Sequence, residues 1–302
     1  MGISHYLKEI GRGKDGARAL DRAQAADLMS QVLDGEVSDL ELGAFCLAMR
    51  VKGETPEEMA GFLDAAHQRL NKVATGGAPT VVLPSYNGAR KLPVLTPLLA
   101  MLLAREGVAV VVHGSTTDDQ RVPAEAVLAE LGILGGTDAH GAVNAQARQL
   151  RFVRTATLHA GLDRLLSVRR TVGLRNSGHS LVKLMNPCDG PALVVGSYTH
   201  PEYLQSMSAA FALTGQHALL LRGTEGEPVA DVRRTPAMDV FRNGQTRRVQ
   251  AQREGSLDKL PDMPAIDPAA TATYIQQVLC GERAVPEPIA LQVRHILSEV
   301  KP

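Results

Sequence analysis

The chain has 302 residues, of which 44% are hydrophobic and 21% charged, the balance of a soluble globular protein large enough for two lobes. Basic and acidic residues number 32 each, so the zero net charge excludes a uniformly basic nucleic-acid-binding surface and allows only a local basic patch. Aromatic residues make up 3%, which disfavours extensive base stacking. Three scattered cysteines and the lack of an apolar run of about 20 residues predict a reduced, cytoplasmic protein without membrane contact.

Residues 1–73 predict an all-helical unit. The first 18 residues are basic and interrupted by glycines, which favours a solvated entry segment. Three stretches at 21–24, 38–41 and 55–58 then carry residues that begin helices, and apolar residues follow each at helical spacing. Helices this short bury little apolar surface alone, so we expect them to pack on the rest of the chain, on a second subunit, or on both.

From residue 80 onward strands and helices alternate, which predicts a largely parallel sheet covered by helices. A strand at 81–83 leads through a polar turn at 85–91 to a helix at 96–105 and a strand at 108–112. Ligands bind at the carboxyl ends of parallel strands, so the polar residues after these two strands are candidate site residues. The other predicted strands are 150–153, 192–195 and 217–221, and the other helices are 123–131, 142–149, 156–186 in at least two pieces, 201–213, 268–279 and 286–299.

Charge is unevenly distributed along the chain. From His140 to Cys188 there is a single acidic residue, Asp163, against eight basic ones, which are Arg148, Arg151, Arg154, Arg164, Arg169, Arg170, Arg175 and Lys183. Arginine enrichment suits phosphate contacts, because a guanidinium donates two parallel hydrogen bonds. The same segment could instead face the acidic N-terminal helices or water, and the sequence leaves these alternatives open.

Several stretches resemble the anthranilate phosphoribosyltransferase family, which is glycosyltransferase family 3 with the nucleoside phosphorylase class III fold. The resemblance covers nearly the whole chain. It rests on residues 28–62 (LMSQVLDGEVSDLELGAFCLAMRVKGETPEEMAGF), 110–115 (VVVHGS), 173–191 (GLRNSGHSLVKLMNPCDGP), 198–207 (YTHPEYLQSM) and 219–227 (LLLRGTEGE).

The fold that the resemblance implies is α/β: a small all-helical domain plus a large α/β domain with a mostly parallel central sheet. Residues 1–73, joined by mid-chain helices at about 156–186, would form the helical domain. Residues 77–155 and 187–302 would form the α/β domain, with the active cleft between the two. The resemblance also implies a homodimer formed through the helical domain.

The motifs of the catalytic site depart from the family pattern. The family's Gly-Thr-Gly-Gly-Asp loop, whose backbone N–H groups cradle pyrophosphate, is here Ser-Tyr-Asn-Gly-Ala-Arg at 85–90. Its Lys-His-Gly-Asn motif lacks the lysine at 112–115, and only part of the acidic pair that holds Mg²⁺ survives at 224–228. Arg175 stands at the place of the substrate-binding arginine, and Thr96 keeps a hydroxyl.

These departures resemble the YbiB-type, TrpD-like proteins. That resemblance implies a non-enzymatic homodimer that binds nucleic acid (single-stranded DNA or RNA, or duplex) with little sequence preference, and that has no catalytic residues, cofactor or metal. From the charge map and the motif positions we expect phosphate contacts from Arg90, Lys91, Arg169, Arg170, Arg175 and Lys183. A residual anion site would comprise Ser85, Asn87, Gly88, His113 and Ser115.

Two other hypotheses come from different classes of protein. One is a phosphoribosyl- or glycosyltransferase with an altered donor site, which would use Mg²⁺. Arg175 favours it, and the lost glycines and aspartate of the loop oppose it. The other is a scaffold that binds a small anion or an acidic protein.

Overall fold

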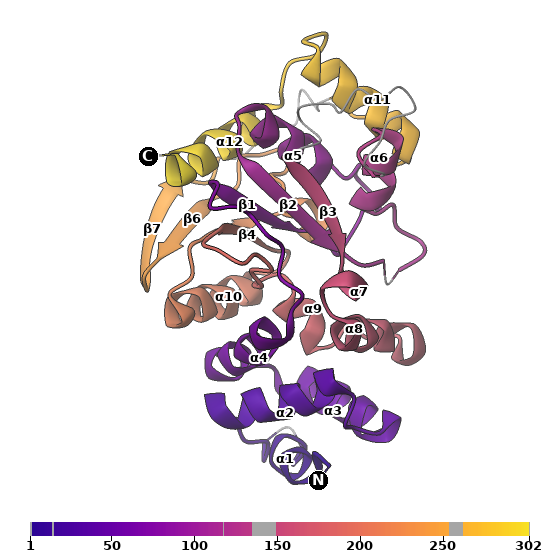
Figure 1. The fold of residues 1–302 in the computed structure, drawn as a ribbon, viewed down its shortest axis with the longest axis vertical. Coiled ribbons are helices and arrows are strands. Elements are labelled where there is room, and N and C mark those ends of the chain that lie inside the picture. The colour runs from indigo at the N-terminus through magenta and orange to yellow at the C-terminus, as the bar shows by residue number, and fades with distance from the viewer. Residues whose placement is uncertain (1, 14, 117, 135–148, 254–261, 302) are drawn as a thin grey trace.

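The computed structural model describes residues 2–13, 15–116, 118–134, 149–253 and 262–301. Helices α1 (Ser4–Ile10), α2 (Arg22–Asp34), α3 (Asp39–Lys52) and α4 (Pro56–Arg69) lie at one end of the molecule (Figure 1). The predicted starts of α2, α3 and α4 are confirmed, because Asp21, Ser38 and Thr55 each form a complete capping box. These local hydrogen bonds fix where each helix begins.

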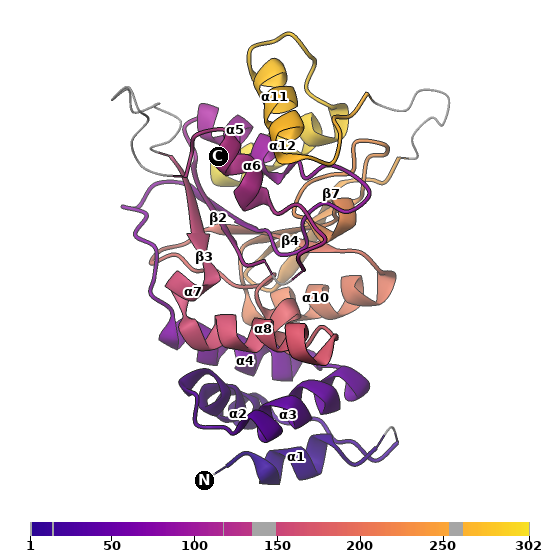
Figure 2. The ribbon, with the colours of Figure 1, turned by 90° about the vertical axis from the view of Figure 1, so that its right-hand side faces the viewer.

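The first residues are not the solvated segment that the sequence predicts. Helix α1 packs against α3 and buries Ile3 and Ile10, so it forms the outermost layer of the helical end (Figure 2). Tyr6 and Leu7, between the two isoleucines, pack against the same core, so positions 3, 6, 7 and 10 form one apolar helical face among the basic residues and glycines of this segment.

A seven-stranded sheet forms the centre of the rest of the chain, in the order β3-β2-β1-β4-β5-β6-β7. Strands β1 to β5 pair in parallel, whereas β6 and β7 add an antiparallel edge. Valine and leucine fill the inner strands because both faces of a parallel sheet are buried. The strands are β1 (Thr80–Pro84), β2 (Ala109–Gly114), β3 (Leu150–Arg154), β4 (Leu193–Tyr198), β5 (Ala218–Arg222), β6 (Met238–Arg242) and β7 (Gln245–Gln250).

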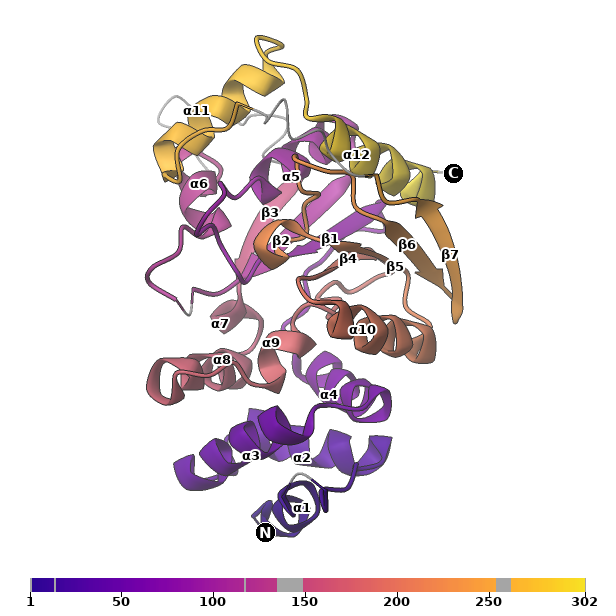
Figure 3. The same ribbon diagram turned by 180° about the vertical axis from the view of Figure 1, so that it is seen from behind.

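Helices cover both faces of the sheet (Figures 1 and 3). On one face lie α5 (Thr96–Arg105), α6 (Ala124–Glu130), α11 (Pro268–Leu279) and α12 (Glu287–Val300). On the other side lie α7 (Thr155–Leu158), α8 (Ala160–Val172), α9 (Ser177–Leu181) and α10 (Pro201–Thr214). The predicted bounds of α5 and α11 agree with the structure, and most of the helix predicted at 142–149 lies outside the described residues.

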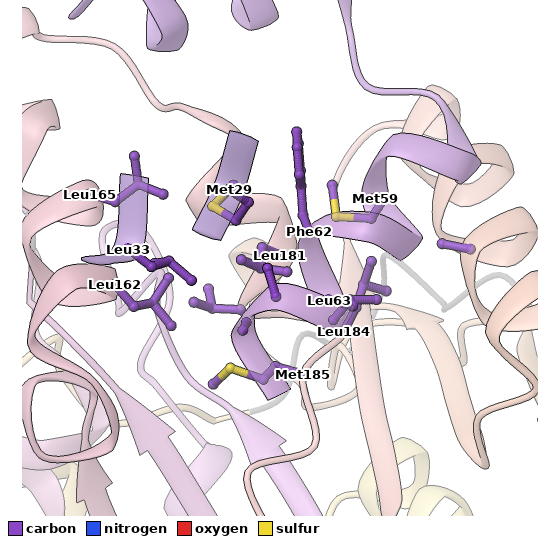
Figure 4. Packing of buried hydrophobic residues seen from close by; sticks show 14 of the residues in the cluster. Met29, Leu33, Met59, Phe62, Leu63, Leu162, Leu165, Leu181, Leu184 and Met185 are labelled. Atoms are coloured by element: carbon purple, nitrogen blue, oxygen red, sulfur yellow. The ribbon is translucent and has the colours of Figure 1, made fainter. Parts of the chain in front are cut away.

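One apolar core joins the helical end to the sheet. Figure 4 shows Met29, Phe62, Leu165 and Leu181, which come from α2, α4, α8 and α9, in the same packed cluster. This cluster continues to Val82 and Val111 on the facing side of the sheet. The mid-chain helices thus pack with the N-terminal helices, and the carboxyl ends of the parallel strands point toward this junction (Figure 1).

The α/β fold with a small helical domain and a mostly parallel sheet is confirmed. No helix among the described residues combines the length and the apolar character needed to cross a membrane.

Candidate anion-binding cleft

The loop after β1 is bonded to a glutamate from another part of the chain. Backbone N–H groups of Asn87 and Gly88 donate to one carboxylate oxygen of Glu227, at 2.8 and 2.9 Å. The hydroxyls of Ser85 and Thr96 donate to the other oxygen, at 2.5 and 2.8 Å. Glu227 is 1% exposed, and the four hydrogen bonds compensate for the cost of burying its carboxylate.

A second glutamate bonds the next part of the same loop. Backbone N–H groups of Arg90, Lys91 and Leu92 donate to the carboxylate of Glu225, at 2.7, 3.1 and 3.4 Å. Glu225 belongs to the 3₁₀ turn η1 (Thr224–Gly226) that follows β5, and the Asn87 side chain donates to its carbonyl oxygen at 2.5 Å. The anion-binding donors of the loop are therefore occupied by the chain's own carboxylates.

The space beside this loop is correspondingly small. A cavity of about 20 Å³ lies between Asn87, Gly88, Ser115 and Asp118. A volume of that size holds about one water molecule. A pyrophosphate group does not fit there in this arrangement.

Mg²⁺, which the family resemblance implies, would require free carboxylate oxygens at this site. Both oxygens of Glu227 already accept hydrogen bonds, and the carboxylate of Glu225 is held by three N–H groups. Within the described part of the chain no group of three or more His, Cys, Asp or Glu side chains is arranged to hold a metal ion. The donor set in this arrangement therefore does not fit Mg²⁺.

His113, at the end of β2, lies fully buried beside this loop. Its Nδ1 hydrogen-bonds the hydroxyl of Tyr86 at 2.8 Å, and that hydroxyl contacts Thr155 at 3.0 Å. Burial lowers the pKa of His113 to about 3, so the imidazole is neutral. In this state His113 supplies no positive charge to an anion.

The predicted phosphate contacts Arg169 and Arg170 are paired with acidic residues across the cleft. Arg169 donates to Asp118 at 2.7 Å, and Arg170 donates to Asp119 at 3.1 Å and to the carbonyl oxygen of Thr116 at 2.8 Å. Burial raises the pKa of Asp118, but the bond from Arg169 and the other favourable contacts together lower it more, and the pKa lies below its usual value. These contacts tie the loop after β2 to α8.

Ser115 belongs to the same connection, since its hydroxyl donates to Asp163 of α8 at 3.0 Å. Arg169 and Arg170 of the basic segment therefore face an acidic loop of the α/β part, whereas Arg164 pairs with Asp39 of the N-terminal helix α3 at 2.8 Å. Ser115 was an expected site residue, but the two aspartates of this loop were not.

Arg175 and Lys183 lie in a larger cavity, of about 470 Å³, between the α3–α4 connection and α10. Within the described residues Arg175 has no hydrogen-bond or ion-pair partner. Burial lowers its pKa, and the like charges of Arg169 and Arg121 add to this effect, although a guanidinium remains charged. A partly buried cation without an ion-pair partner gains a favourable interaction when an anion reaches it.

Lys183 is buried at the inner wall of this cavity. Its ammonium group donates to the carbonyl oxygens of Gly226 and Ser197, at 2.8 and 3.3 Å. Burial, followed by the charge of Arg175, lowers its pKa to about 8. Because Gly226 belongs to η1, Lys183 connects the cavity to the turn that fills the β1 loop.

The cavity also contains ring side chains. Tyr198, His200 and Tyr203 line it together with Arg175 and Lys183. The rings of His200 and Tyr203 lie 6.5 Å apart, and Tyr198 and Tyr203 are half-buried. His179 also lines the cavity, but burial and the nearby arginines lower its pKa to about 3, so it is neutral.

Apart from His113, which is buried against Tyr86, the expected site residues form three groups that are joined through η1 and α8. Arg175 and Lys183 share the larger cavity. Ser85, Asn87, Gly88, Arg90 and Lys91 form the loop bonded by glutamates. Arg169, Arg170 and Ser115 bridge to the loop after β2. The carboxylates that pair with these groups were not among the expected site residues. The sequence signals for them were Glu225 and Glu227, shortly after one strand, and the adjacent Asp118 and Asp119, shortly after another.

Comparison with known proteins agrees with this fold. Residues 4–69 match the helical bundle domain of the glycosyl transferase family. Anthranilate phosphoribosyltransferase from Beijerinckia indica is 29% identical over 280 residues, covering 90% of this chain and 81% of the enzyme. Another relative is 41% identical over 301 residues and covers 97% of this chain and 92% of its own length. The chain belongs to the anthranilate phosphoribosyltransferase-like proteins of glycosyltransferase family 3. The relative at 41% is the uncharacterized protein YbiB of Escherichia coli strain K12, so the chain is a YbiB-type member.

Solved structures show the same fold. Anthranilate phosphoribosyltransferase from Thermus thermophilus superimposes with a TM-score of 0.72 at 22% identity, covering 98% of this chain and 88% of that enzyme. The Saccharomyces cerevisiae enzyme in complex with PRPP and Mg superimposes with a TM-score of 0.67 at 15% identity, covering 99% of this chain and 86% of the enzyme.

Proposed function

We propose that this chain is a non-enzymatic nucleic-acid-binding protein that uses the cleft of a phosphoribosyltransferase fold to hold single-stranded DNA or RNA with little sequence preference. One observation carries the proposal: the loop that would hold pyrophosphate is filled by Glu225 and Glu227, while Arg175 is left unpaired among the described residues of the larger cavity. Arg175 is thus available to bind a phosphate, whereas the loop after β1 has no room for the pyrophosphate group of a phosphoribosyl donor.

The composition of the cavity supports a single strand as the ligand. Proteins that bind single strands without sequence preference combine cations for phosphates with ring side chains on which bases stack. Tyr198, His200 and Tyr203 supply such rings beside Arg175 and Lys183. The low aromatic content of the whole chain is therefore less of an objection, because two of its five tyrosines lie in this cavity.

A phosphoribosyl- or glycosyltransferase remains a second candidate, and the relatives named as anthranilate phosphoribosyltransferases favour it. They match over 79–96% of this chain. Catalysis would require η1 to withdraw its two glutamates, so that the loop after β1 could receive PRPP and Mg²⁺. The filled loop supports the non-enzymatic proposal over this one.

Fluorescence anisotropy of a single-stranded oligonucleotide of about 20 nucleotides, labelled at its 3′ end and titrated at several salt concentrations, tests the proposal. We expect log K to fall with log salt with a slope of about −1.4, since Arg175 and Lys183 supply two phosphate contacts and each contact on a single strand contributes roughly −0.7. Absence of binding at low salt would contradict the proposal. Turnover of PRPP and anthranilate with Mg²⁺ would then establish the transferase instead.

We also propose that the protein forms a homodimer, and an exposed apolar stripe on α3 supports this part of the proposal. Leu40, Leu47 and Val51 are 84, 51 and 62% exposed and lie on one face of the helix. Gly43 continues the same face and has no neighbouring atom within 4 Å of an added Cβ. Large apolar side chains gathered on one face of a helix are typical of an interface.

Replacing Leu47 with Glu is expected to shift the protein from dimer to monomer, because a carboxylate would be buried without a partner at the centre of the stripe. Light scattering after gel filtration measures the mass. Leu213→Glu is the matched control, because Leu213 is likewise an exposed leucine on a helix, with 40% exposure, but lies on α10 outside the stripe. A monomeric wild-type protein at micromolar concentration would contradict the proposed dimer.

Oligonucleotide binding is expected to weaken above pH 8. Lys183 is charged below its pKa of about 8 and neutral above it, so its attraction for phosphate is lost as the pH rises. A bound phosphate raises this pKa, so the affinity should fall by up to about tenfold per pH unit between the free and the bound values. Anisotropy between about pH 6.5 and 9.5 measures the profile. Lys183→Met should bind more weakly and show a flat profile, whereas Lys91→Met should keep the wild-type slope.

A further inference from the structure

We propose that Glu225 is a displaceable carboxylate covering a second anion site, which takes a terminal phosphate monoester. The site consists of the backbone N–H groups of Arg90, Lys91 and Leu92 together with the Arg90 and Lys91 side chains. It adds recognition of a chain end to the nucleic-acid binding proposed above, and it rests on that function for the identity of the ligand.

The two glutamates of the η1 region are held very differently. Glu227 is 1% exposed and accepts from two N–H groups and two hydroxyls, so it is a fixed part of the interior. Glu225 is only partly buried, and two of the residues that donate to it, Arg90 and Lys91, are exposed. An external anion can therefore compete for the donors of Glu225 but not for those of Glu227.

The backbone around Glu225 is held by contacts that do not involve the Glu225 carboxylate. The Asn87 side chain donates to the carbonyl oxygen of Glu225. The next residue, Gly226, is anchored through its carbonyl oxygen to Lys183 and Ser197. Withdrawal of the Glu225 side chain thus costs only its contacts with the loop, and it leaves the rest of η1 in place.

The donors fit a phosphate better than a carboxylate. Three consecutive N–H groups converge on one carboxylate, an arrangement that also suits the tetrahedral oxygens of a phosphate. The Arg90 and Lys91 side chains have no hydrogen-bond or ion-pair partner among the described residues and can add charge. A phosphate monoester carries about −1.5 to −2 charges at pH 7, whereas a carboxylate or a phosphodiester carries about −1.

The geometry also selects a chain end. Glu225 reaches the three N–H groups at the tip of a side chain, from η1 to the β1 loop. A terminal phosphate is likewise carried at the end of a single stalk, so it can replace the carboxylate along the same approach. A phosphodiester inside a strand is attached on both sides, so it cannot enter as a terminal phosphate does.

Anisotropy competition between two otherwise identical oligonucleotides tests the inference, one with a 5′-phosphate and one with a 5′-hydroxyl. We expect the wild type to bind the phosphorylated strand about tenfold more tightly. Calorimetric titration with inorganic pyrophosphate should give about tenfold tighter binding for Glu225→Ala than for wild type or for Glu282→Ala, an exposed glutamate outside the loop. The double variant Arg90→Gln with Lys91→Gln should lose the preference for the 5′-phosphate.

Equal affinity for the two oligonucleotides, together with unchanged pyrophosphate binding by Glu225→Ala, overturns the inference. The comparison of the two oligonucleotides uses the wild-type protein, so equal affinity could not be explained by misfolding of a variant. Binding of the 5′-hydroxyl strand tests the proposed function by itself. Failure of the end site is therefore distinguishable from failure of nucleic-acid binding.

Discussion

Replacing Arg175 with Glu is expected to lower the affinity for a single-stranded oligonucleotide by about a hundredfold, which corresponds to about 2.7 kcal/mol. Arg175 is a cation of the large cavity without a hydrogen-bond or ion-pair partner among the described residues, and its guanidinium is partly buried. The reversed charge would repel the same phosphate. Anisotropy at low salt measures the loss.

Two further variants make this result specific. Arg175→Gln removes the charge without reversing it and should cost about tenfold in affinity. Arg283→Glu changes an exposed arginine that pairs with Asp262 near α11, and it should leave binding within about twofold. If all three variants bind like the wild type, the cavity around Arg175 does not contact the nucleic acid.

Replacing Glu227 with Ala is expected to lower the free energy of unfolding by about 4 kcal/mol. The change leaves the N–H groups of Asn87 and Gly88 and the hydroxyls of Ser85 and Thr96 without their acceptor in a buried place. Urea denaturation followed by circular dichroism gives this value, and an unchanged slope with urea would show that stability alone has changed.

Conservative change at Glu227 should cost far less. Gln keeps one oxygen for the two N–H groups, and its amide can donate to the two hydroxyls, so Glu227→Gln should cost about 1 kcal/mol. Glu225→Ala should also cost about 1 kcal/mol, because Glu225 is partly exposed. A small effect of Glu227→Ala would mean that its carboxylate does not hold the β1 loop in place.

Elements specified by nearby residues agree with the predictions from the sequence. The helix starts at Asp21, Ser38 and Thr55 depend on side chains three residues away, and such pairs are visible in the sequence. The bounds of α5 follow from one continuous apolar stretch with Pro97 in its first turn. The first residues were expected to be solvated because of their basic residues and glycines, although apolar residues recur at helical spacing at positions 3, 6, 7 and 10.

The candidate site was harder to predict because its partners are distant in the sequence. Arg169 and Asp118 are 51 residues apart, and Asn87 and Glu227 are 140 residues apart. An arginine-rich segment indicates phosphate contacts only as long as its internal partners are unknown. The residue types of the site were therefore predictable, whereas the pairing of its charges required the fold.

Asp118, Asp119 and Glu225 have a consequence for which anions the protein can select. Each occupies donors that an external phosphate would need, so a small anion gains one contact by displacing one carboxylate. A strand presents many phosphates on one backbone, and after its first contact the others compete at a high effective concentration. A ligand would therefore need several linked phosphates to displace the internal carboxylates. The protein would then bind a polymer in preference to free nucleotides and metabolite phosphates without any contact to the bases.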